Sequence, residues 1–148
     1  MSTAALGAGF GWRWPVVGPV LRIFEPPATQ YGAGHRGIDV ACAPGGPIAA
    51  VAGGIVTFAG PVGGLLYVTI DHGNGLSSTD SYVAKVLVRR GQTVAPGESL
   101  ATCGLGHPGS TIPHVHLGVR RADGTYIDPL SVLAPADLSS FIHLAPRR

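Results

Sequence analysis

Two histidines separated by one residue are the part of the sequence best suited to chemistry. His114 and His116 lie in the run STIPHVHLGVRR, which is apolar, rich in β-branched residues and followed by the turn signal Asp123–Gly124. A run of this kind predicts a strand. Side chains two apart on a strand point to the same face, with Cα atoms about 6–7 Å apart. The two imidazoles could therefore serve one small site, as two metal ligands or as one ligand and one proton-transfer group. The alternative is a pair of surface histidines at a strand end.

A histidine and a carboxylate in the segment HRGIDV form the second candidate. His35 and Asp39 would share a face on a helix, but Gly34 and Gly37 disfavour a helix here. On a straight strand the two residues would lie roughly 13 Å apart, too far to hold one ion. The glycines permit a bend or bulge that would bring the two side chains together.

These two clusters together offer the donors of a catalytic zinc site, which needs three protein ligands and an open position for water. His35, Asp39 and one of the two histidines at 114 and 116 would meet that need. The remaining histidine would be left to move protons or to stabilise charge. The sequence has no HExxH motif with a glutamate base, so a histidine is the available group for proton transfer.

The elements that must position these residues are predicted to be short strands. Of the 148 residues, 45% are hydrophobic and 12% are charged, which argues against disorder and for one domain with a core. The 23 glycines and 13 prolines favour strands joined by tight turns. The turn signals recur at the spacing typical of an all-β sandwich or barrel. The predicted strand regions are 12–24 with a turn at Gly18–Pro19, 47–59 with a break at Gly53–Gly54, 65–71, 81–94 with a turn at Gly91, 99–104 and 110–121.

Composition also excludes several classes of function. The net charge is only +2 and the basic residues are scattered, so we expect no nucleic-acid partner. No stretch reaches the roughly 18 apolar residues of a transmembrane helix. The start of the chain lacks the pattern of a signal peptide, so no export signal is visible. Cys42 and Cys103 could form a disulfide in an exported protein or remain two buried thiols, and the absence of a CxxC pair argues against a cysteine zinc site.

Four segments, in this order, carry a resemblance to a known family: HRGIDVACAPGGPIAAVAGGIVTFAG, VTIDHGNGL, VRRGQTVAPGESLATCG and STIPHVHLGVRRADGTYIDPLSVL. Together they resemble the LytM/lysostaphin-type zinc metallopeptidases, peptidase family M23. The resemblance covers residues 12–133, which leaves 1–11 as a flexible lead-in and 134–148 as a C-terminal tail. It implies an all-β fold of antiparallel sheets that form a sandwich or barrel-sandwich hybrid of the duplicated hybrid motif type, with little or no helix.

The resemblance also implies roles for individual residues. By motif position, His35, Asp39 and His116 would bind Zn²⁺, and His114 would be the catalytic histidine. The reaction implied is hydrolysis of peptide bonds in the cross-links or stem peptides of bacterial peptidoglycan. Such a protein would be a monomer and would be extracellular, periplasmic or associated with the cell wall.

One departure from the family pattern affects the expected activity. Members usually carry a further catalytic histidine in a Tyr-x-His-Leu segment, but counting without gaps from Leu76 to Gly91 places Tyr82 there, and sliding the segment places Ala84 there. A tyrosine hydroxyl can donate a hydrogen bond, but with a pKa of about 10 it is a poor proton shuttle. Losing one donor of this kind typically lowers the rate by about 10²–10³.

We therefore expect zinc binding to be retained and peptidase activity to be weakened or absent. The alternative is a catalytically weak or inactive domain that binds the cell wall or regulates a partner hydrolase. His107, in the loop LGHPGS, would either face solvent or reach the groove and replace the missing histidine. His72, in a turn, is expected to be structural or solvated.

Overall fold

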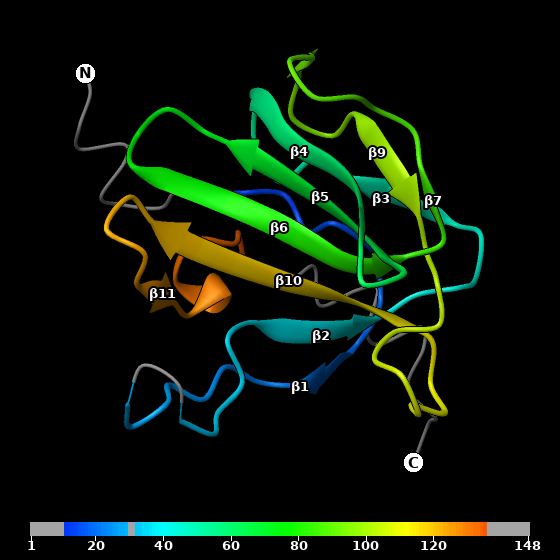
Figure 1. Ribbon diagram of the computed structural model, residues 1–148, viewed down its shortest axis with the longest axis vertical. Coiled ribbons are helices and arrows are strands. Elements are labelled where there is room, and N and C mark those ends of the chain that lie inside the picture. The colour runs from blue at the N-terminus through cyan, green and yellow to red at the C-terminus, as the bar shows by residue number, and fades with distance from the viewer. Residues whose placement is uncertain (1–10, 30–31, 136–148) are drawn as a thin grey trace.

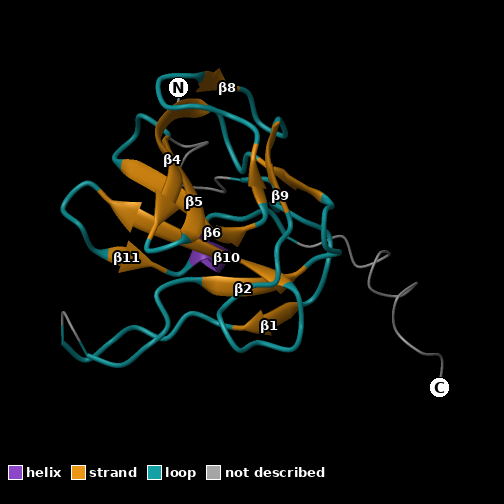
Figure 2. Cartoon of the chain, turned by 45° about the vertical axis from the view of Figure 1, so that its right-hand side comes forward, coloured by secondary structure: helices purple, strands orange, loops and turns teal. Residues whose placement is uncertain are grey.

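The computed structural model describes residues 11–29 and 32–135, which form two antiparallel sheets (Figures 1 and 2). The larger sheet has eight strands. Its order is β1 (Val20–Arg22), β2 (Ile38–Ala41), β10 (His114–Arg121), β6 (Leu76–Val83), β5 (Leu65–Asp71), β4 (Gly54–Val62) and β8 (Thr93–Val94), with β11 (Tyr126–Ile127) paired to β10. The smaller sheet has the order β3 (Pro47–Ala49), β9 (Ser99–Thr102) and β7 (Lys85–Val86). Among the described residues the single helix is a 3₁₀ turn, η1 (Pro129–Ser131), so the predicted all-β fold is confirmed.

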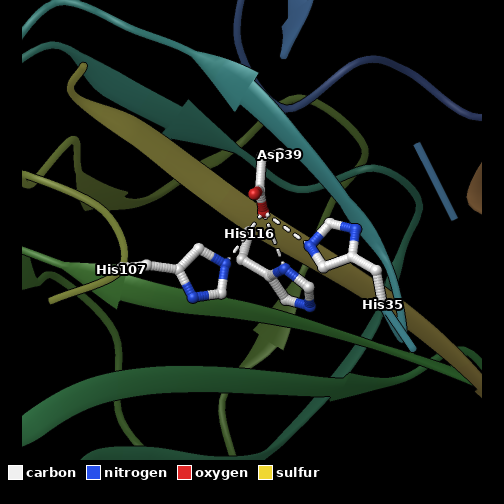
Figure 3. A group of neighbouring side chains, drawn as sticks. All are labelled: His35, Asp39, His107 and His116. Carbon is white, nitrogen blue, oxygen red and sulfur yellow. Dashed lines mark hydrogen bonds and ion pairs between the residues drawn. The ribbon is translucent and has the colours of Figure 1, made fainter. Parts of the chain in front are cut away.

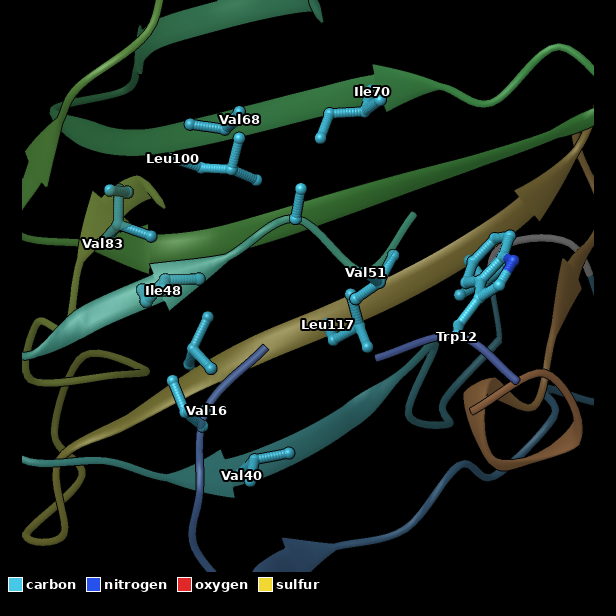
Figure 4. Packing of buried hydrophobic residues seen from close by; sticks show 14 of the residues in the cluster. Trp12, Val16, Val40, Ile48, Val51, Val68, Ile70, Val83, Leu100 and Leu117 are labelled. Atoms are coloured by element: carbon cyan, nitrogen blue, oxygen red, sulfur yellow. The ribbon is translucent and has the colours of Figure 1, made fainter. Parts of the chain in front are cut away.

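The core lies between the two sheets, and β10 separates it from the candidate site. Val115, Leu117 and Val119 point into the core and have no exposed surface. Because side chains alternate along a strand, His114 and His116 point to the opposite face. Figure 4 shows residues from β2, β5, β10 and the small sheet packed in one cluster. The core thus holds β10 rigidly while leaving its histidines on the outer face.

β6 begins earlier than the predicted strand 81–94, and that region is divided among the end of β6, β7 and β8. The run LSSTDS is rich in residues that favour turns, so the sequence pattern does not predict a strand there. It is a strand nevertheless because it pairs with β5 on one side and β10 on the other. Its inward-facing Ser78 and Asp80 are both buried.

The two ends of the described chain meet at Trp12. Its backbone N–H donates to the carbonyl of Val132, and its own carbonyl accepts from the N–H of Ala134. The Trp12 ring is buried against the ring of His72, with centroids 4.6 Å apart. These contacts join the first described residues to the segment around η1. The limits 12–133 of the unit stay a prediction. Residues 1–10 of the lead-in and 136–148 of the tail lie outside the described residues.

His72 has a structural role, as expected. Its Nδ1 lies 2.8 Å from the carbonyl oxygen of Gly53, and its Nε2 lies 2.8 Å from Oγ of Ser78. Burial lowers the pKa of its imidazole, with a partly opposing effect of the hydrogen bond to Gly53. His72 therefore joins the turn before β6 to the start of β4.

A disulfide joins Cys42 to Cys103 across a sequence separation of 61 residues, with Cα atoms 6.1 Å apart. This settles the choice between a disulfide and two thiols in favour of the disulfide. Cys42 directly follows β2, and Cys103 directly precedes the segment 104–113, which we call the site loop. The cross-link therefore holds the first end of the site loop beside β2. No helix in the part of the chain that the structure describes is long and apolar enough to cross a membrane.

Candidate metal centre

The pairing of β2 with β10 places a carboxylate directly opposite a histidine. Asp39 and His116 are partners in the register of the two strands, and Nδ1 of His116 lies 2.8 Å from Oδ1 of Asp39. A Cβ at Gly37 would collide with the backbone of Leu117 and lie 2.7 Å from Nε2 of His116. Glycine at position 37 therefore leaves room for the imidazole.

His35 reaches the same carboxylate because the chain bends before β2. A two-residue bridge holds its backbone against Glu25, with hydrogen bonds of 2.8 and 2.9 Å. Its Nδ1 lies 2.9 Å from the carbonyl oxygen of Ile23, which can only accept, so Nδ1 carries the proton. Nε2 is then left with its lone pair, 3.2 Å from Oδ1 of Asp39. A backbone carbonyl that fixes the tautomer in this way is typical of a metal-binding histidine.

A third imidazole comes from the site loop. Nε2 of His107 lies 3.1 Å from Oδ1 of Asp39, so imidazole nitrogens of three histidines surround one carboxylate oxygen (Figure 3). One ligand atom from each of His35, Asp39, His107 and His116 lies within 4.8 Å of the others. This donor set of imidazole nitrogens and a carboxylate oxygen fits Zn²⁺.

His114 lies beside this group and is almost completely buried, with 3% of its side chain exposed. Its Nδ1 donates to the carbonyl of Ile112 at 2.8 Å, and its Nε2 accepts from the backbone N–H of His107 at 3.2 Å. The same Nε2 is 3.8 Å from Oδ2 of Asp39. His114 is thus a neutral imidazole whose only lone pair faces the carboxylate and the site loop.

Tyr82, which the count without gaps places where the family's further histidine belongs, faces the site. Its ring centroid lies 4.5 Å from that of His107 and 6.2 Å from that of His116. Tyr82 has φ of 67° and is, among the described residues, the one non-glycine residue with positive φ. In the β5–β6 register Tyr67 pairs with Ser81 and Leu66 pairs with Val83. Tyr82 is therefore the extra, unpaired residue of a bulge in β6. This bulge turns the tyrosine toward the histidines.

The electrostatics of the cluster favour an ionised carboxylate at Asp39. Burial opposes ionisation of Asp39, but the hydrogen bond from His116 and the neighbouring imidazoles hold its pKa down to about 2. Burial lowers the pKa of His107, although Asp39 acts in the opposite direction. Burial, Tyr67 and Asp39 all raise the pKa of Tyr82, so its phenol stays protonated at neutral pH.

The structure brings together all four residues that the sequence assigned to the site: His35, Asp39, His114 and His116. Their individual roles remain proposals. It adds His107, whose ring reaches Asp39 and does not simply face solvent. Whether His107 replaces the missing histidine stays a prediction. The signal for His107 was weak because a loop residue has no periodicity that would fix its direction.

Comparisons with known proteins identify the family. Residues 33–129 match peptidase family M23. The murein hydrolase activator NlpD of Escherichia coli (strain K12) is 33% identical over 126 residues, covering 82% of this chain and 31% of that protein. The lipoprotein NlpD/LppB homolog of Pseudomonas aeruginosa is 35% identical over 127 residues, covering 83% of this chain and 40% of that protein.

Solved structures give the same result. A zinc-containing peptidase from Vibrio cholerae superposes with a TM-score of 0.68 and 26% identity, covering 86% of this chain and 40% of that one. The chain spans less than half the length of each of these three proteins. The family match covers well over half of the chain and includes every residue of the candidate centre. This chain belongs to peptidase family M23.

Proposed function

We propose that this domain is a zinc-dependent endopeptidase that hydrolyses peptide bonds of bacterial peptidoglycan. The observation that carries the proposal is the convergence of His35, Asp39 and His116 on one point, with His114 at its edge. Membership of peptidase family M23 and the similarity to a zinc-containing peptidase support zinc as the ion.

Each residue has a distinct task in this proposal. His35, His116 and Asp39 would hold the zinc ion, which would supply polarisation of the scissile carbonyl and activation of a water molecule. His114 accepts a proton at Nε2 and passes it to the leaving amine, while its Nδ1–H continues to donate a hydrogen bond to the carbonyl of Ile112. Tyr82, protonated at neutral pH, donates a hydrogen bond to the developing oxyanion. Because a phenol replaces an imidazole there, we expect a slow enzyme.

A second candidate function is regulation of another cell-wall hydrolase. It is favoured by the relatives named murein hydrolase activators and by Tyr82 in place of a catalytic histidine. In that case the face that carries the candidate centre would bind peptidoglycan or a partner hydrolase without cleaving a peptide bond. Either function places the domain outside the cytoplasm, in the extracellular space, the periplasm or the cell wall. The disulfide supports an oxidising environment, and one relative is named a lipoprotein.

The test is a paired assay on one preparation of the protein. Zinc is measured by elemental analysis, and release of soluble fragments from purified peptidoglycan is followed with and without a chelator. We expect about one zinc per chain, by the three-ligand rule for catalytic sites, and chelator-sensitive release. His114→Ala should abolish release and leave the zinc content unchanged.

The same assay separates the two functions. Bound zinc without release from several types of cell wall would favour the regulatory domain. Release that persists in His114→Ala would contradict the role of that residue. Release that is insensitive to the chelator would contradict the zinc mechanism.

A further inference from the structure

The site loop places a fourth donor against the three residues of the proposed zinc site. We propose that His107 is a fourth protein ligand and that the loop holds the site closed in the resting domain. This inference rests on the proposed zinc site and goes beyond the three-ligand centre of the proposed function.

The first argument is the equivalence of His107 to the other ligands. Its Nε2 is 3.1 Å from Oδ1 of Asp39, compared with 3.2 Å for Nε2 of His35 and 2.8 Å for Nδ1 of His116. Its ring centroid lies 5.9 Å from that of His35 and 5.2 Å from that of His116. A histidine that served only as a proton shuttle would not need its nitrogen at the point where the other donors converge.

The second argument is the exposure of the donors. The side chain of His107 is 31% exposed, whereas those of His35 and His116 are 4% and 14% exposed. His107 therefore covers the solvent side of the cluster, the side from which water and substrate would enter. Catalytic zinc sites keep this position open, whereas four protein ligands are typical of structural sites.

The third argument is that the loop is held in this position by several contacts. Gly106 has φ of 87° and packs against the ring of His114, which any Cβ at position 106 would strike. The ring of Tyr82 stacks at a tilt against that of His107. A turn closed by the hydrogen bond from the N–H of Ser110 to the carbonyl of His107, 2.9 Å long, follows directly. Cys103 anchors the start of the loop through its disulfide.

One residue thereby blocks two functions. The side chain of His107 occupies the donor position, and its backbone N–H occupies the lone pair of His114 at Nε2. Displacing the loop would free the open position and the proton-transfer histidine in a single movement. With the site loop in place, the resting domain would be inactive. It would become active when a peptide of the cell wall, or a partner protein, moves the loop.

Cobalt substitution tests the coordination without measuring activity. Co²⁺ is bound to the whole protein in place of zinc, and azide is titrated while the visible absorption spectrum is recorded. With four protein ligands the wild-type spectrum should not respond to azide. His107→Ala should respond, and its zinc affinity should fall at least about ten-fold, since even the loss of an outer-shell partner typically lowers affinity 10–100-fold. Pro108→Ala, the neighbouring loop residue, is the matched control and should behave as wild type.

A second variant pair tests direct contact with the ion. His107→Cys should give a cobalt–thiolate charge-transfer band in the near ultraviolet, and Pro108→Cys should not. The Cys42–Cys103 disulfide is verified in both variants by mass spectrometry.

The outcomes are distinct. A wild-type spectrum that responds to azide, with unchanged zinc affinity in His107→Ala, would overturn the ligand role. The ligand role would also be overturned if His107→Ala lowered peptide release while the cobalt spectrum stayed unchanged. That result would make His107 a catalytic residue. If neither wild type nor any variant binds zinc or cobalt, the proposed function fails together with this inference. That result is distinguishable from failure of the His107 role alone.

Discussion

Asp39 and His116 face each other across the antiparallel pair of β2 and β10, with 2.8 Å between Oδ1 and Nδ1. Because the carboxylate is also in contact with His35 and His107, we predict that Asp39→Asn removes the charge on which zinc binding depends. Zinc at 100 times its Kd should stabilise the wild-type domain by about 2.7 kcal/mol, and this stabilisation should vanish in the variant. Thermal unfolding with and without zinc measures it. Asp71→Asn, at the exposed end of β5, should retain the zinc response.

Tyr82→His should increase peptidase activity. The substitution places an imidazole beside His107 and His116, and histidine tolerates positive φ better than most non-glycine residues. A restored charge-stabilising donor is worth about 10²–10³ in rate. Peptide release from purified peptidoglycan is the measurement, in the wild-type and the His107→Ala background.

Tyr67→His serves as the matched control, because it adds an imidazole on the neighbouring strand, where the ring centroid lies 5.8 Å from that of Tyr82. An equal gain from Tyr67→His, or none from Tyr82→His in either background, would argue against a catalytic position at residue 82.

Asp80 should make the domain less stable as pH rises. Burial raises its pKa from 3.8 to about 7, and its Oδ1 has no hydrogen-bond partner. The folded state therefore prefers the protonated acid. The contribution of Asp80 to the free energy of unfolding is therefore greatest below pH 3.8. It falls between about pH 4 and 7, by up to about 4 kcal/mol.

Urea unfolding at a series of pH values measures this loss. Asp80→Asn should remove most of the loss and leave a variant that is more stable than wild type above pH 7. The exposed Asp71→Asn should follow the wild-type profile. A profile of Asp80→Asn that parallels the wild type would show that Asp80 is not the responsible group.

Removal of the disulfide should destabilise the domain and loosen the site loop. A cross-link that spans 61 residues restricts the unfolded chain by about 4 kcal/mol. Cys42→Ser combined with Cys103→Ser should lose about that amount in urea unfolding and should bind zinc more weakly. A reductant should reproduce the loss in wild type and have no further effect on the double variant. Equal free energies of unfolding for the oxidised wild type and the double variant would contradict a stabilising role of the disulfide.

The sequence predicted the fold and most of the candidate site because both depend on local patterns. The alternation along β10 predicts that His114 and His116 share a face, and the glycines around His35 and Asp39 permit those two side chains to meet. The choice of His116 as a ligand and of His114 as the catalytic histidine came from the resemblance to peptidase family M23. The start of β6 was missed because its polar run becomes a strand only through pairing on both sides. The position of His107 depends on the disulfide and on the packing of Gly106 against His114, which are contacts between distant segments.

The disulfide has a consequence for how the domain gains and loses its ion. Asp39 lies three residues before Cys42, and His107 lies four residues after Cys103, so the covalent bond and a shared ion would close nearly the same loop. In the oxidised chain, joining the two ligands closes a ring of about ten residues instead of one spanning 68, which saves roughly 2 kcal/mol of chain entropy. The disulfide therefore lowers the entropic cost of bringing these two ligands together, and ion binding should be stronger in the oxidised chain than in the reduced chain. An oxidised domain should therefore keep residues 39 and 107 close together when the ion leaves, so we expect it to rebind the ion without refolding.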